Sequence, residues 1–289
     1  MQHKWTFKAK RSDDVALEYG LKQLRRDELN TLRQELLGTP AVHDARAWDI
    51  KIISGVGFSA VPKNVDAIRQ VLGIRPEHTV VVAPVFSGEW SKIHPEAIGI
   101  DFSRTALKKH PNPAKILADL RNIPLEDGIA DHVVSYEPTP LHAGTASPAD
   151  VLATLRELTR IGNSVHIIQR AKNKTPLWVT PFLLKYLTIL GIPYRIIDLT
   201  KHVQLRTRFP YRVVSVTIDG AAARENIDTI SKDVRVAKAF TQDVANGQIV
   251  SARQHLRKGS SALRSALLSR YLAWALTSKL WRLPRGMEK

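Results

Sequence analysis

The sequence predicts an α/β fold in which seven strands form a mostly parallel sheet with helices on both faces. Short β-branched and apolar runs alternate with turn-forming residues and with longer amphipathic segments, which is the pattern of repeated strand–helix units. The chain has 289 residues, of which 44% are hydrophobic. This is enough for one large buried core with appendages.

The expected strands lie between residues 78 and 218. The first, His78–Val85, is too short and too β-branched for a helix, so we interpret it as a buried strand. Six further apolar runs are interpreted as strands: 97–100, 114–118, 132–135, 165–169, 194–199 and 211–218. A basic connection over 201–208 joins the last two.

Amphipathic or strongly apolar segments between and around these runs predict helices. The segment Pro148–Ile161 follows Ser147, a good N-cap, and ends at Gly162, which can stop a helix. Further helices are expected over residues 12–37, 62–72, 177–190, 221–248 and 260–281.

Two neighbouring strands each finish on an acid, Asp101 and Asp119. The carboxyl ends of parallel strands meet at one edge of the sheet, where ligands bind in open α/β folds. A carboxylate there can accept hydrogen bonds from both hydroxyls of a ribose or from an exocyclic amine of a base. Either acid alone is better explained as a cap of the next turn or helix, but the pair in register favours a shared site.

The same region resembles the nucleotide-binding half of the class I S-adenosylmethionine-dependent methyltransferases. The stretch Ile98-Gly-Ile-Asp-Phe-Ser103 is similar to the second-strand motif of that family, and Ala118-Asp-Leu-Arg-Asn-Ile-Pro-Leu125 to its third motif. Leu125–Ser135 is similar to the stretch that leads along its fourth strand. The resemblance spans Val65 to Ile218, about half of the chain. It implies a Rossmann-like sheet whose last strand is antiparallel to the others.

By this resemblance the chain is an S-adenosylmethionine-dependent methyltransferase, acting on a nucleic acid or a small molecule. In that family the second-strand acid, here Asp101, holds the cofactor ribose, and the third-motif acid, here Asp119, meets the adenine amine. The cofactor-binding residues that the resemblance implies are Gly88, Asp101, Phe102, Asp119, Leu120 and Ser135.

The loop after the first strand departs from the family's pattern, which is acid-x-Gly-x-Gly-x-Gly. Those glycines let the backbone approach the methionine part of the cofactor closely. Here the loop reads Val82-Ala-Pro-Val-Phe-Ser-Gly88, so Pro84 removes a backbone donor and Phe86 adds bulk. A second interpretation follows: a methyltransferase-like protein that no longer uses the cofactor and acts as a basic RNA-, ribosome- or membrane-surface-binding module.

The segment after the fourth strand, Tyr136–Gly144, faces the transferred methyl group in the resembled family. Its candidate catalytic residues are Tyr136, Glu137 and His142. His142 could act as a general base because the ordinary pKa of histidine lies near neutrality, although a loop histidine without a role is the simpler interpretation. The sequence has no cysteine and no histidine pair at helical ligand spacing, so we expect no metal site, and it has no Gly-x-x-x-x-Gly-Lys loop for nucleotide hydrolysis.

The chain carries a formal net charge of +16, from 43 Lys and Arg against 27 Asp and Glu. Such a charge attracts polyanions, and the excess is concentrated in residues 253–289, where Glu288 is the single acid. The helix expected over 260–281 has one apolar face, formed by Leu263, Leu267, Tyr271, Trp274 and Trp281. It could lie on an anionic membrane, dock on RNA, or pack against the core of its own chain.

We expect three parts: an N-terminal helical cover (1–61), a methyltransferase-like α/β core (62–220) and a basic helical extension (221–289). The first residues lack the apolar stretch of a secretory signal, and no apolar run approaches the ~20 residues of a membrane span. These features favour a cytoplasmic location, with peripheral membrane contact through the basic helix as the alternative.

Overall fold

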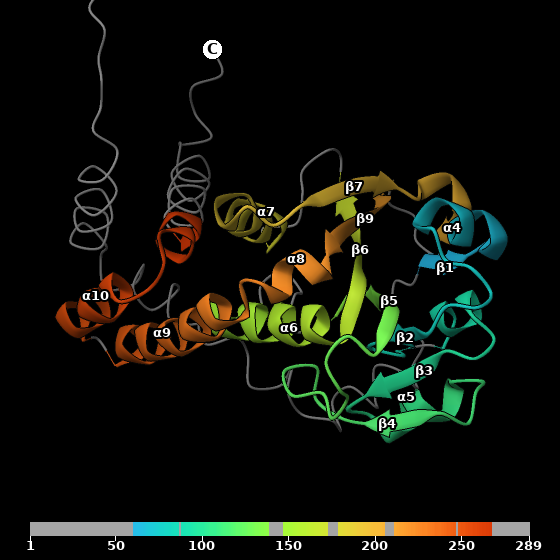
Figure 1. Ribbon diagram of the computed structural model, residues 1–289, viewed down its shortest axis with the longest axis horizontal. Helices are drawn as coiled ribbons and strands as arrows, with labels where there is room; N and C mark the ends of the chain where they lie inside the picture. Colours follow the sequence, from blue (N-terminus) through green and yellow to red (C-terminus); the bar gives the residue numbers. More distant parts are fainter. Residues whose placement is uncertain are drawn as a thin grey trace, which may run out of the picture.

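A seven-stranded sheet with helices packed on its faces forms the centre of the molecule (Figure 1). The computed structural model describes residues 60–86, 88–138, 147–172, 179–205, 211–246 and 248–267. The helix expected over 12–37 lies outside these ranges. The predicted boundaries of the three parts stay a prediction.

The strand order of the sheet is β4-β3-β2-β5-β6-β9-β7. Strands β2 to β6 pair in parallel, whereas β9 runs antiparallel to both β6 and β7. The prediction of a mostly parallel sheet with an antiparallel last strand is therefore confirmed. The strands are β2 (Val80–Val82), β3 (Ile98–Asp101), β4 (Lys115–Leu117), β5 (Ala130–Tyr136), β6 (Gly162–Lys172), β7 (Tyr194–Asp198) and β9 (Tyr211–Asp219).

The helices follow the predicted capping signals closely in the middle of the chain. Ser147 accepts a hydrogen bond from the amide of Asp150, and Gly162 follows the last helical residue of α6, as expected. The helices are α4 (Val65–Leu72), α5 (Arg104–Lys109), α6 (Pro148–Ile161), α7 (Val179–Leu190), α8 (Gly220–Arg224), α9 (Ile227–Ala245) and α10 (Ile249–Arg257), with 3-10 helices η2 (Trp90–Ile93) and η4 (Thr200–His202). Residues 261–267 are helical as well.

Several stretches differ from the expectation. The helix expected over 221–248 is divided into α8 and α9, and α5 and α10 were not expected. The helix expected from residue 62 begins at Val65, because the side chain of Asn64 accepts a hydrogen bond from the amide of Ala67 and caps it there. The residues before it form strand β1 (Ala60–Pro62), which pairs antiparallel with β8 (Val203–Leu205) in a separate small sheet. Strand β8 occupies part of the basic connection expected over 201–208. Strands of three residues carry too little pattern to be recognised from sequence.

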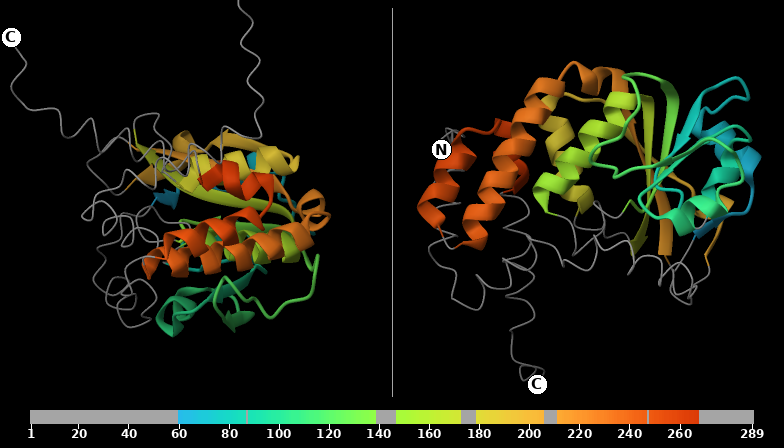
Figure 2. Two further views of the ribbon diagram at one scale, coloured as in Figure 1. Left: turned by 90° about the vertical axis from the view of Figure 1, so that its left-hand side faces the viewer. Right: turned by 90° about the horizontal axis from the view of Figure 1, so that it is seen from below.

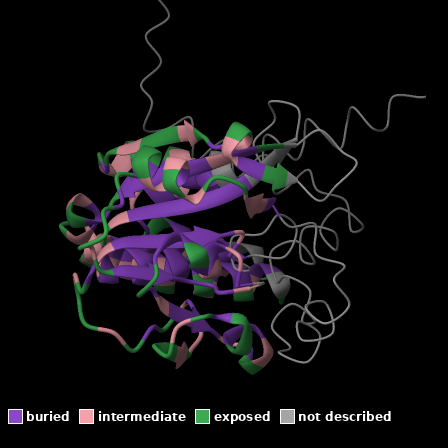
Figure 3. Cartoon of the chain, turned by 90° about the vertical axis from the view of Figure 1, so that its right-hand side faces the viewer, coloured by how far each residue is buried: buried purple, intermediate pink, exposed green. Residues whose placement is uncertain are grey.

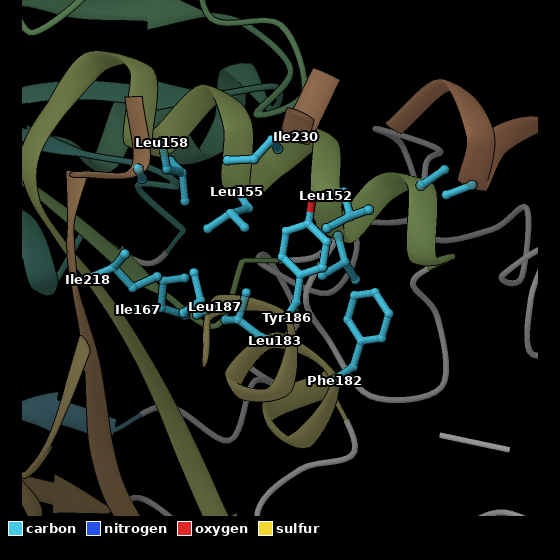
Figure 4. Packing of buried hydrophobic residues seen from close by; sticks show 14 of the residues in the cluster. Leu152, Leu155, Leu158, Ile167, Phe182, Leu183, Tyr186, Leu187, Ile218 and Ile230 are labelled. Atoms are coloured by element: carbon cyan, nitrogen blue, oxygen red, sulfur yellow. The ribbon is translucent and has the colours of Figure 1, made fainter. Parts of the chain in front are cut away.

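Each face of the sheet has its own hydrophobic core, and the central strands β2 and β5 between them consist almost entirely of buried residues (Figure 3). On one face, α6 and α7 contribute Leu155, Leu158 and Leu187 against Ile167 and Ile218 of the sheet (Figure 4). On the other face, α4 and η2 pack against β2 and β5; their buried side chains are Ile68, Leu72, Trp90 and Ile93. Both cores therefore hold the central strands in place.

The C-terminal helices pack on the first of these cores. Leu263 and Leu267, which the sequence placed on the apolar face of the basic helix, are fully buried in it. Asp233 of α9 fastens the segment, since its carboxylate accepts hydrogen bonds from the hydroxyl of Tyr186 and from the amide of Ser260. Of the three expected positions of the basic helix, its described part, residues 261–267, packs against the core of its own chain. No described helix combines the length and apolar character needed to cross a membrane.

A chain of three histidines crosses the second face of the sheet. The Nδ1 atom of His78 lies 2.9 Å from Nε2 of His132, and Nδ1 of His132 lies 2.9 Å from Nε2 of His166. Nδ1 of His166 in turn lies 3.0 Å from the hydroxyl of Thr217. Burial lowers the pKa of His132 to about 4 and that of His166 to about 3, and in each case the charge of a neighbouring histidine lowers it further.

We expect this chain to make the fold sensitive to acid. In the unfolded protein both buried histidines take up a proton near their ordinary pKa of 6.5, whereas the folded protein leaves them neutral down to about pH 4. The unfolded state therefore binds more protons in this window, and the free energy of unfolding falls as pH falls through it. Urea unfolding at pH 7.5 and pH 5 measures the difference.

The matched variant is His132→Asn, which removes one of the two buried imidazoles. Its free energy of unfolding should change less between the two pH values than that of the unmodified chain. An equal pH dependence in both proteins would contradict the assignment.

Candidate functional site

The candidate site lies at the carboxyl edge of the parallel strands. Strand β2 has β3 on one side and β5 on the other, so the chain reverses its direction of winding between β2 and β5. Ligands of open α/β sheets bind at such a reversal, outside the carboxyl ends of the strands. The acids predicted for the site follow the two strands on the β3 side of it.

Asp101 ends β3 and holds the connection that follows β2. Its side chain is only 3% exposed; Oδ2 accepts a hydrogen bond of 3.0 Å from the amide of Phe86 and Oδ1 one of 2.9 Å from the amide of Ser103. Burial raises the pKa of Asp101 to about 6, although the surrounding amides favour the charged form. The carboxylate is thus already bound by the backbone of its own chain.

The connection after β2 lies close against β3 and α5. Val85 donates its amide to the carbonyl of Ile100, and Phe86 adopts a left-handed backbone with φ of 53°. Gly88 has φ of 77°, and a Cβ atom there would lie 2.4 Å from the carbonyl oxygen of Lys109. Gly88 is therefore required by the close approach to α5, independently of any ligand.

Aromatic rings fill the space behind this connection. The ring of Tyr136 stacks on Trp90 at a centroid distance of 5.2 Å and meets Phe86 edge-on at 6.4 Å. The Tyr136 side chain is buried, and its hydroxyl accepts a hydrogen bond of 2.8 Å from the amide of Ala60. Ser135, also buried, donates its hydroxyl to the carbonyl of Ala83. Both residues thus hold β5 against the connection.

Asp119 lies two residues beyond β4 and forms a closed pair with Arg121. Its Oδ1 accepts hydrogen bonds from the amide and from Nε of Arg121, at 2.8 and 3.0 Å. Arg121 also bridges to Asp150 at the start of α6, at 2.8 Å, and the two carboxylates raise its pKa. Leu120 is buried in the core beneath this pair.

The structure places the two acids at neighbouring strand ends. Asp101 is in register with Leu117, and the amide of Ala118 donates to the carbonyl of Asp101 at 3.0 Å. Asp101 and Asp119 therefore lie at one edge, as the sequence indicated. Each carboxylate nevertheless has its own protein partners: backbone amides for Asp101 and a guanidinium for Asp119.

Sequence reasoning missed the residues that hold the loop after Asp119. Arg160 of α6 donates to the carbonyls of Ile123 and Leu125, both at 2.7 Å. Glu157, 5% exposed, accepts from the amide of Ile123 at 3.0 Å. An acid followed by arginine three residues later in a helix was the available signal, but it is common on exposed helix surfaces and carries little information alone.

The remaining candidates lie toward the end of β5. Phe102 is half-buried, and Glu137 has a left-handed backbone with φ of 41°. The Glu137 amide donates to the carbonyl of Ile168 at 2.8 Å. His142 lies outside the described residues. The catalytic roles of Tyr136, Glu137 and His142 stay predictions.

S-adenosylmethionine fits this edge at one end only. Asp101 and Asp119 at the ends of β3 and β4 are the acids that would meet the ribose and the adenine, and Leu120 lies buried next to Asp119. At the methionine end, Pro84 has no amide hydrogen, the amide of Phe86 is bound to Asp101, and Gly88 backs onto Lys109. Within the described residues, this connection would have to move before its backbone could bind a ligand.

Comparison with known proteins finds distant similarity to solved methyltransferase structures. A geranyl diphosphate methyltransferase in complex with geranyl diphosphate and sinefungin is 12% identical over 63% of this chain and 100% of its own, with a TM-score of 0.43. Geranyl diphosphate C-methyltransferase from Streptomyces coelicolor A3(2), with Mg²⁺ and S-adenosyl-L-homocysteine, is 13% identical over 63% and 98%, with a TM-score of 0.42.

A third structure joins the Haloferax volcanii Trm112 methyltransferase activator to a provisionally assigned methyltransferase. It is 14% identical over 60% of this chain and 97% of its own, with a TM-score of 0.37. The chain matches no protein-family model and no curated protein sequence. The strand order and the antiparallel β9 identify the fold: the chain has the class I, Rossmann-like methyltransferase fold.

Proposed function

We propose that the protein is an S-adenosylmethionine-dependent methyltransferase that binds its cofactor across the carboxyl ends of β3 and β4. The observation that carries this proposal is the placement of Asp101 and Asp119 at neighbouring strand ends, beside the reversal between β2 and β5. No other described part of the sheet edge pairs two acids in this way. The acceptor is a nucleic acid or a small molecule.

Each residue of this edge has a defined task in the proposal. Asp101 accepts hydrogen bonds from the ribose hydroxyls, which requires it to exchange its bond to the Phe86 amide. Asp119 accepts from the adenine amine, which requires it to exchange a hydrogen bond from Arg121, and Leu120 packs beside the base. Phe102, Ser135 and Gly88 would line the cofactor once the connection after β2 has moved, since Ser135 now bonds the carbonyl of Ala83 and Gly88 packs on Lys109. The bound cofactor would supply an electrophilic methyl group, and the protein would contribute mainly the positioning of the two reactants.

Acceptor groups that carry a proton need a base beside the methyl group. The segment after β5 supplies the candidates, with Glu137 at its start and His142 within it. His142 would take the proton from the acceptor hydroxyl or amine, because the ordinary pKa of an imidazole suits proton transfer near neutral pH.

A second candidate function is favoured by the closed connection after β2. The amide of Phe86 binds the carboxylate of Asp101, and its ring packs on Tyr136, where a glycine loop would face the cofactor. In this alternative the fold is a scaffold that binds RNA, ribosomes or an anionic membrane surface through its basic residues. The net charge of +16 supports it.

Titration with S-adenosylhomocysteine by calorimetry tests the first proposal. We expect binding in the micromolar range, and Asp101→Asn should weaken it at least tenfold, because the amide is a poorer acceptor for two ribose hydroxyls. Asp66→Asn, on an exposed position of α4, is the control and should bind as the unmodified chain does. Absence of binding at millimolar ligand in the unmodified chain would move the assignment to the second candidate.

Phe86→Gly should strengthen the binding of S-adenosylhomocysteine. Glycine adopts a φ of 53° without cost and removes the ring from the loop. Phe86→Ala, which removes the ring but keeps the cost of the left-handed backbone, separates the two effects. If neither substitution changes the affinity, the ring does not limit access to the edge.

Removal of residues 268–289 tests the second candidate, and the buried Leu263 and Leu267 remain in the shortened chain. Under that candidate, affinity for single-stranded RNA should fall, and its dependence on salt should become weaker because fewer phosphates are neutralised. Filter binding over a salt series measures both quantities. Unchanged affinity and salt dependence would exclude these residues as the binding surface.

A further inference from the structure

A cavity of about 430 Å³ lies between α6 and α9. Helix α9 follows the part of the chain that resembles methyltransferases, so one wall of the cavity lies outside that resemblance. The two helices are in contact and run side by side in the right-hand view of Figure 2. Its apolar lining comes from alanines of α6 and from Val234. Its polar lining combines three cations, Arg121, Arg156 and Lys238, with one carboxylate and three neutral groups: Asp150, Ser147, Thr241 and Gln242. The Asp150 carboxylate is bound by Arg121 and by the hydroxyl of Ser147. A volume of this size is within the range of small-molecule pockets, ~300–1,000 Å³.

The cations of the cavity are not equally compensated. Arg121 is paired with both Asp119 and Asp150. Arg156 is paired with Glu157 at 3.0 Å through one edge of its guanidinium. Lys238 is exposed and forms no ion pair within the described part of the chain. The cavity therefore has an uncompensated positive charge on its α9 side.

Thr241 supplies a second, independent observation. It lines the cavity and is only 6% exposed, yet its hydroxyl oxygen has no hydrogen-bond partner among the described residues. A buried hydroxyl without a hydrogen-bond partner destabilises a protein. We therefore expect a ligand or another polar group to form the missing hydrogen bond. Thr241 lies three residues after Lys238, which places both side chains on the same side of α9.

We propose that this cavity binds a small phosphate monoester. The phosphate lies between Lys238 and Arg156, where charge-assisted hydrogen bonds are strongest, and the Thr241 hydroxyl donates to one of its oxygens. The organic part lies on the alanines of α6 and on Val234, and Gln242 and Ser147 offer hydrogen bonds to its hydroxyls. This site is additional to the proposed cofactor edge and uses a helix that the methyltransferase resemblance does not include.

Calorimetric titration of the full chain with glucose 6-phosphate, inorganic phosphate and glucose tests the proposal. Glucose 6-phosphate should bind most tightly, inorganic phosphate more weakly, and glucose not at all. Lys238→Gln should weaken binding of glucose 6-phosphate about tenfold, a loss that corresponds to ~1.4 kcal/mol. Lys232→Gln is the matched control, because Lys232 is an exposed lysine of the same helix outside the cavity lining, and it should leave binding unchanged.

Thr241→Val adds a readout that a purely structural threonine would not give. It should weaken binding of glucose 6-phosphate several-fold while leaving the Tm of the free protein equal or higher, because it removes the buried hydroxyl without a partner. A lower Tm with unchanged binding would overturn the role of Thr241.

Equal weakening by Lys238→Gln and Lys232→Gln, binding of glucose as tight as of its phosphate, or no binding of any probe would overturn the site. Titration of the Lys238→Gln chain with S-adenosylhomocysteine separates this proposal from the function proposed above, since the cofactor edge does not include Lys238.

Discussion

The buried carboxylate of Asp101 is the interaction on which the arrangement of the site depends. It joins the end of β3 to the connection after β2 through two backbone amides, and it does so at a position where water has almost no access. Amide donors around a buried carboxylate compensate the cost of its burial. The same residue type that would hold a ribose therefore holds the protein's own chain, and any ligand must compete with these amides.

Most of the fold could be predicted because its signals are local. Strands β2 and β5 are runs of β-branched residues, and α6 has both of its end signals in the sequence. The pairing of β1 with β8 could not be predicted, since each contributes three residues from distant parts of the chain. Whether a short segment forms a strand is then decided by its tertiary partner.

The positions of the site residues followed from the strand pattern, but their partners did not. The sequence placed Asp101 and Asp119 after neighbouring strands, and the register agrees. It did not reveal that Arg121 forms an ion pair with Asp119. Nor did it reveal that Glu157 and Arg160 of α6 form hydrogen bonds with the backbone of the loop after Asp119. Contacts between a loop and a helix some 35 residues away depend on packing that no local pattern encodes.

The two outermost strands of the sheet, β4 and β7, differ in how they limit its growth. β4 has three residues and offers almost no backbone to a further strand. β7 has five, and within the described chain no strand pairs with its outer edge. Ile196 of β7 is 55% exposed. Two charged residues within β7, Arg195 and Asp198, oppose the addition of a strand from another molecule. Edge-to-edge aggregation of this protein would therefore begin at β7, and neutralising those two charges would promote it.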